Sequence, residues 1–191
     1  RIDAWDATWQ QAAEDHATEL ASCDLVVSAM GDWASEGALN EWHLENRHSV
    51  PIVYGWTEPH AAAGHAVATL ADGGCLQCHV DTTGLPLLRV TEWPISTIRK
   101  EPGCGAVYQP YGPIELENII SLVAELAIDC LLGAVTTSIH RIWASRSSLV
   151  AAAGGNWTAE WKAIAGTRTF GAFVEERPWR AVQTCPECSA I

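Results

Sequence analysis

Over the first third of the chain, short apolar runs alternate with longer segments whose apolar residues are spaced as in a helix. The stretch 24–30, DLVVSAM, holds a continuous apolar run of the kind found in buried parallel strands. The stretches 51–56 and 64–70 are apolar in the same way, whereas 7–22 and 33–46 have the spacing of helices with one inward face. Strand, helix and strand in this order predict an α/β fold with a parallel sheet.

The second half of the chain predicts one long helix and a long loop before it. The helix is expected at 112–133, where a proline suits the first turn and apolar residues recur along one face. The next stretch, 134–153, is compatible with a second helix, and two short strands are expected at 167–173 and 179–184. The stretch 81–105 has little periodicity, which indicates a long ordered loop of the kind that is uncommon unless functional.

Composition narrows the class of protein. Of the 191 residues, 48% are apolar and 18% charged, which is typical of a globular domain. The formal net charge of −12 argues against a nucleic acid or an anionic membrane as the main partner. No apolar run approaches the roughly 20 residues of a membrane span, and no signal-peptide pattern is present. We expect a cytoplasmic protein.

The start of the chain predicts a fragment. Since the chain opens on Arg1 and its single Met is Met30, we expect it to be a piece of a longer protein.

The cysteines carry the strongest chemical signal. Two Cys-x-x-Cys pairs, Cys75 with Cys78 and Cys185 with Cys188, lie far apart in the chain. Each pair presents two thiolates to one ion, and two pairs complete the tetrahedral four-sulfur site typical of structural zinc. We expect the ion to fasten the end of the chain to the middle of the domain. Disulfides or two redox pairs are the alternatives, although a redox pair normally needs only one motif, at a helix start.

Other residues with potential chemistry have plainer interpretations. Cys23 and Cys130 lie in apolar sequence and are predicted to be core residues. His60 and His65 form no H-E-x-x-H motif and are interpreted as polar residues that flank a strand. His79, beside the first cysteine pair, is a candidate neighbour of the metal ligands.

The order of these features resembles one enzyme family. A strand ends in DLVVSAM-GD, a helix carries LN at 39–40, and the strand PIVYGW is followed by GHAV. Then come a Cys-x-x-Cys pair, a loop, a lone cysteine before a long apolar helix, and the second pair. This order is similar to that of the C-terminal half of the ThiF/MoeB and ubiquitin-activating enzyme superfamily. The resemblance implies that residues 1–191 are the C-terminal part of a ThiF-type adenylyltransferase domain, with a Rossmann-like α/β fold.

The resemblance also implies an activity. Members of that family use Mg–ATP to adenylate the C-terminal glycine of a ubiquitin-like or sulfur-carrier protein, and many then pass the activated carboxyl group to a cysteine. The resemblance implies that the two cysteine pairs ligate structural zinc, that Cys104 is the acceptor, and that Asp32 helps to hold magnesium and the ATP phosphates. It further implies a possible homodimer. Asp32 has a second interpretation, as the N-cap of the helix 33–46.

The chain departs from the family pattern in two places. None of its 15 glycines makes the G-x-G-x-x-G turn that cradles phosphate. Counted back from Asn40, the family spacing lands on Gly31, one residue before Asp32. The nucleotide-binding N-terminal half is therefore expected upstream of Arg1, and this chain alone is expected to adenylate poorly. Two hypotheses follow: a cysteine-bearing module of an activating enzyme, or a zinc-stapled ThiF-like scaffold that binds a carrier without nucleotide chemistry.

Overall fold

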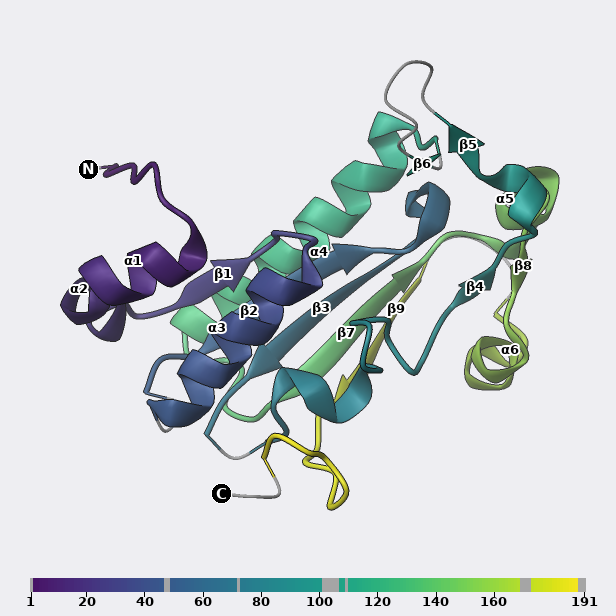
Figure 1. The fold of residues 1–191 in the computed structure, drawn as a ribbon. Helices are drawn as coiled ribbons and strands as arrows, with labels where there is room; N and C mark the ends of the chain where they lie inside the picture. Colours follow the sequence, from purple (N-terminus) through teal and green to yellow (C-terminus); the bar gives the residue numbers. More distant parts are fainter. Residues whose placement is uncertain are drawn as a thin grey trace.

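A five-stranded sheet forms the centre of the molecule, with strand order β1-β2-β3-β7-β9 (Figure 1). The computed structural model describes residues 2–46, 49–71, 73–100, 107–108, 110–168 and 173–188. The strands of this sheet are β1 (Val26–Ser28), β2 (Ile52–Thr57), β3 (Ala63–Thr69), β7 (Ile139–Ala144) and β9 (Phe173–Pro178). Two short pairs lie outside it: β4 (Thr91–Glu92) with β8 (Asn156–Trp157), and β5 (Arg99–Lys100) with β6 (Val107–Tyr108).

The long predicted helices at 33–46 and 112–133 are confirmed. The helices are α1 (Trp9–Asp15), α2 (Ala17–Ala21), α3 (Trp33–Glu45), α4 (Pro113–Leu131), α5 (Ser147–Ala152) and α6 (Ala159–Ala165), and the 3₁₀ turns are η1 (Pro59–Ala61), η2 (Leu76–His79) and η3 (Ile95–Thr97). The helix predicted at 7–22 is divided at His16, whose φ of −125° is not helical. After α4, Gly133 has a φ of +69°, a backbone conformation that favours glycine and ends the helix.

Different helices cover the two faces of the sheet (Figure 1). Successive side chains of a strand point to opposite faces. Val53 of β2 therefore packs with Ile119 and Leu126 of α4, whereas its neighbour Tyr54 packs with Leu39 of α3. Each face of the sheet thus has its own hydrophobic core.

The sheet is mostly antiparallel, so the expectation of a parallel sheet holds only at one edge. β1 runs parallel to β2, with Val26 opposite Ile52, and α3 lies in the connection between them. The other three pairs of neighbouring strands, β2 with β3, β3 with β7 and β7 with β9, are all antiparallel. The physical reason is the length of the connections. Only residues 58–62 join β2 to β3, and a parallel crossover needs about a dozen residues or more.

Two further expectations are wrong in the second half of the chain. The stretch 134–153 is not one helix, because β7 fills the place between β3 and β9 before α5 begins. Neither of the two strands expected near the end matches a strand of the structure: β9 (Phe173–Pro178) lies between the two stretches and shares only Phe173 with the first, of which residues 169–172 lie outside the described residues. The stretch 179–184 leaves the sheet instead. It begins with the buried Trp179, and it leads the chain to Cys185.

Candidate functional site

The two cysteine pairs come together as predicted. The sulfur atoms of Cys75, Cys78, Cys185 and Cys188 all lie within 4.8 Å of one another. The Sγ atoms of Cys75 and Cys185 are 3.6 Å apart, and those of Cys78 and Cys188 are 3.3 Å apart. A tetrahedral ion with metal–sulfur bonds near 2.3 Å places its ligands about 3.8 Å apart. These separations fit a four-sulfur metal site and exceed the ~2.05 Å of a disulfide.

Close backbone packing brings the two pairs to one place. The first pair lies on η2 after β3, and the second lies in the turn that follows β9. The indole Nε1 of Trp179 donates to the carbonyl oxygen of Cys75 at 3.0 Å, and the backbone N–H of Gly74 donates to the carbonyl oxygen of Trp179 at 3.1 Å. A Cβ atom added at Gly74 would lie 2.6 Å from the carbonyl oxygen of Arg180. Glycine is therefore required where the two segments meet.

The electrostatics of the cluster favour the ionised, thiolate form of one cysteine, Cys78. A hydrogen bond from Cys75 lowers the pKa of the Cys78 thiol to about 5. Burial raises the pKa of the Cys188 thiol to about 11. Metal binding requires deprotonated thiols, so a bound cation would compensate the charge that burial disfavours.

His79 is the predicted neighbour of the ligands. Its Nε2 donates to the carbonyl oxygen of Arg180 at 2.7 Å, and this hydrogen bond holds the segment that leads to the second pair.

The other cysteines differ in their surroundings. Cys23 is exposed, so its prediction as a core residue is wrong. Its sulfur contacts the carbonyl oxygen of Glu19 at the end of α2. Cys130 is half-buried and packs against the α4 core, as predicted. Cys104 belongs to the connection between β5 and β6 and lies outside the described residues.

A cleft of about 600 Å³ lies at the carboxyl ends of β1 and β2. Its lining combines three indole side chains, two buried carboxylates and one exposed guanidinium group: Trp33, Trp56, Trp93, Glu36, Glu58 and Arg89. Leu76 also lines the cleft, and this residue lies between Cys75 and Cys78. The cysteine cluster therefore lies directly beside one wall of the cleft.

Asp32 acts as the N-cap of α3, which confirms its second interpretation. Its Oδ2 accepts a hydrogen bond from the backbone N–H of Ser35 at 2.8 Å. Hydrogen bonds from Ser35 lower the pKa of this exposed carboxyl group. Its neighbours Gly31 and Trp33 both line the cleft, whereas Asp32 itself does not. The magnesium role of Asp32 stays a prediction.

Glu36 is a cleft residue that the sequence analysis missed. It is 8% exposed, lines the cleft, and accepts a hydrogen bond from the Ser28 hydroxyl group at 3.2 Å. Burial raises the pKa of this carboxyl group. The sequence signal that could have indicated its burial is its spacing. Glu36 lies on the same helical face as Leu39 and His43, both of which are buried.

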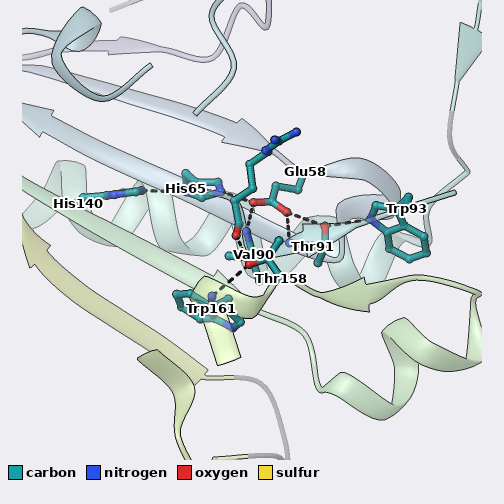
Figure 2. Close-up of polar contacts among 9 residues, drawn as sticks. Glu58, His65, Val90, Thr91, Trp93, His140, Thr158 and Trp161 are labelled. Atoms are coloured by element: carbon teal, nitrogen blue, oxygen red, sulfur yellow. Dashed lines mark hydrogen bonds and ion pairs between the residues drawn. The ribbon is translucent and has the colours of Figure 1, made fainter. Parts of the chain in front are cut away.

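A buried chain of polar groups was also missed (Figure 2). His65 was interpreted as a strand-flanking residue, but it is fully buried within β3. Its Nε2 donates to Oε1 of Glu58 at 2.9 Å, and its Nδ1 lies 2.9 Å from Nε2 of His140 on β7. Nε2 of His65 is a donor, because a carboxylate oxygen only accepts, and its Nδ1 shares a hydrogen bond with Nε2 of His140.

Glu58 joins this chain to the loop that follows η2. Its Oε1 accepts from the backbone N–H of Val90 at 2.6 Å. Its Oε2 accepts from the backbone N–H and the hydroxyl group of Thr91, at 2.8 and 2.6 Å. Burial alone would raise the pKa of Glu58, but the hydrogen bonds from His65, Thr91 and Val90 hold it below its usual value. The carboxylate is thus ionised and fully engaged at neutral pH.

Comparisons with known proteins add no family assignment. No model of a known protein family matches the chain, and no curated protein matches it. Within the described part of the chain, no helix is both long and apolar enough to cross a membrane.

Proposed function

We propose that this chain is the cysteine-bearing part of an ATP-dependent activating enzyme for a ubiquitin-like or sulfur-carrier protein. The observation that supports this best is that the cleft and the cysteine cluster adjoin each other in the segment that holds the first cysteine pair. Leu76, between Cys75 and Cys78, lines the cleft, so a metal ion bound by the four cysteines would fasten the end of the chain beside it. In sequence, the two pairs also enclose the stretch that holds Cys104. The proposal rests on this arrangement together with the order of motifs along the chain.

In this proposal the cleft receives the extended C-terminal tail of the carrier. Its indole walls suit a thin, glycine-rich peptide, and the exposed guanidinium group of Arg89 suits a carboxylate or phosphate oxygen. Asp32, which follows a parallel strand and lies between the cleft residues Gly31 and Trp33, would hold magnesium, which neutralises phosphate charge when it is bound. The four cysteines would hold zinc as a structural cross-link.

The proposed reaction has two steps. A carboxylate oxygen of the carrier's terminal glycine attacks the α-phosphorus of ATP, the bond to the β-phosphate oxygen breaks, and pyrophosphate leaves. The Cys104 thiolate then attacks the acyl carbon, a C–S bond forms, and the acyl–oxygen bond breaks so that AMP leaves with the electron pair. The thiol proton is lost before this attack, since the thiolate is the nucleophile.

The test uses the full-length protein that contains this chain, with ATP and a panel of candidate carriers. ATP–pyrophosphate exchange reports the first step, and a reductant-sensitive carrier adduct reports the second. We expect Cys104→Ala to retain exchange and lose the adduct, whereas the exposed Cys23→Ala retains both. An adduct that persists in Cys104→Ala, or no exchange with any carrier, would overturn the proposal.

A second candidate function is a scaffold that binds a carrier without nucleotide chemistry. Two observations favour it: the chain lacks the phosphate-binding glycine turn, and the Asp32 carboxylate already caps α3. Carrier binding without any pyrophosphate exchange by the full-length protein would support the scaffold over the activating enzyme.

A further inference from the structure

A second cavity, of about 360 Å³, adjoins the cleft, and Pro86 lines both of them. Its ionisable lining residues are His79, His140, Glu160 and Arg177, and the rest of its lining consists of proline, leucine and indole side chains. We call it the histidine cavity. A few polar groups among apolar walls are typical of sites that bind small molecules.

His140 joins the histidine cavity to the buried polar chain. It is 4% exposed, and its Nε2 shares a hydrogen bond with Nδ1 of His65, whose own Nε2 donates to the Glu58 carboxylate (Figure 2). The indole ring of Trp179 packs at nearly a right angle to the His140 ring, with centroids 5.2 Å apart. Within the described residues, Nδ1 of His140 has no hydrogen-bond partner, so this nitrogen is available to a ligand in the cavity.

Arg177 brings a positive charge to the same cavity. It lies directly opposite His140 in the antiparallel pair of β7 and β9, so both side chains point to the same face of the sheet. Arg141 and Arg168 each form an ion pair with a glutamate of β9. Across the described part of the chain, Arg177 forms no ion pair, so its charge is left for a ligand.

Ionisable groups from several elements surround His140. They are His65 on β3 with Glu58 behind it, His79 at the end of η2, Arg177 on β9 and Glu160 on α6. Burial, together with His65, His79 and Arg177, lowers the pKa of His140 well below its usual value, so without a ligand the ring is neutral at neutral pH. Glu160 is exposed, so water screens its negative charge.

We propose that the histidine cavity binds a small oxyanion between Arg177 and His140, and that the paired rings of His65 and His140 take up one proton from solvent as it binds. The oxyanion is a carboxylate or a tetrahedral ion of the phosphate type, since a guanidinium group donates two hydrogen bonds to either. The added proton lets Nδ1 of His140 donate to the ligand. The positive charge on the rings then lies between the Glu58 carboxylate and the oxyanion, which both favour it.

NMR of the full-length protein labelled with ¹⁵N-histidine tests the proposal, with sulfate and acetate as separate probes. Neither ion changes its charge above about pH 6, so any pH dependence of binding belongs to the protein. We expect the ring signals of His140, identified by their loss in His140→Gln, to shift along one saturation curve. Tighter binding of sulfate assigns a site for phosphate-type ions, and tighter binding of acetate assigns a site for carboxylates.

The affinity of the wild type should fall as pH rises above neutral, by up to about tenfold per pH unit, because each oxyanion binds together with one proton. His140→Gln keeps an N–H donor but cannot gain a proton. Its affinity, measured by calorimetry, should therefore not depend on pH.

Arg177→Gln should weaken oxyanion binding at least about tenfold, as loss of a hydrogen bond to a charged group allows. Arg180→Gln is the matched control. It removes the same charge from an exposed side chain that does not line the cavity, and the affinity should stay within about twofold of the wild type. Glu160→Gln should act in the opposite direction and tighten binding about two- to fivefold, because it removes a like charge. These three substitutions keep the proposal testable if the buried His140→Gln fails to fold.

Three outcomes contradict the proposal. Neither probe shifts the His140 signals, or Arg177→Gln and Arg180→Gln weaken binding equally, or the affinity of the wild type does not change with pH. The measurements need neither ATP nor a carrier, so they decide the oxyanion site independently of the proposed activating function.

Discussion

At the scale of single residues, Glu36 and Glu58 are two buried carboxylates in opposite situations. Glu36 has a raised pKa because burial disfavours its charge. Glu58 has a lowered pKa because its hydrogen bonds outweigh burial. A raised folded-state pKa contributes stability at low pH that is lost as pH rises through it. A lowered one contributes stability above the unfolded value of 4.5 that is lost as pH falls through the folded value.

Substitution by Gln should therefore have different effects on stability at the two positions. At pH 7 we expect Glu58→Gln to lose about 3 kcal/mol of unfolding free energy, because an amide cannot accept every bond that the carboxylate accepts. Glu36→Gln should be neutral or stabilising at pH 7, since it removes a buried charge and keeps an acceptor for Ser28. Urea denaturation between pH 3 and pH 8 measures both, and equal effects of the two substitutions would contradict this assignment.

At the scale of elements, α4 packs closely against β3 and β2 of the sheet. A Cβ atom added at Gly64 would overlap the side chain of Ile119, and one added at Gly55 of β2 would lie 2.5 Å from Val123. Glycine in these strands lets α4 approach the sheet closely. The apolar face of α4 was readable from its spacing, but the strand glycines on which it rests were not.

We expect Gly64→Ala to cost about 1–3 kcal/mol of stability, because the added methyl group pushes α4 away from the sheet. Gly37→Ala is the matched control. It is an internal position of α3 with no heavy atom near the added Cβ, and it should gain about 0.5–1 kcal/mol from helix propensity. Thermal unfolding of both variants tests this, and a tolerated Gly64→Ala would show that the contact relaxes freely.

At the scale of the whole molecule, the cysteine cluster links the end of the chain to the loop after β3. We expect purified protein to contain one zinc ion per cluster and Cys185→Ser to lose it. The unfolding free energy should then fall by about 2–5 kcal/mol, the range for loss of a native covalent cross-link. Metal analysis and urea denaturation check this, with the exposed Cys23→Ser as control. Wild-type protein purified without chelator that contains no metal would contradict the metal assignment.

The sequence by itself determined the features that depend on local spacing. The long helices follow from apolar residues that recur every three or four positions, and the metal ligands follow from two Cys-x-x-Cys pairs. Tertiary structure decided strand direction, which depends on the connections, since residues 58–62 are too few for a parallel crossover. It also decided the burial of Glu58, His65 and His140. These side chains come from separate elements, and no local pattern specifies a hydrogen bond such as that between His65 and His140, which lie 75 residues apart in the chain.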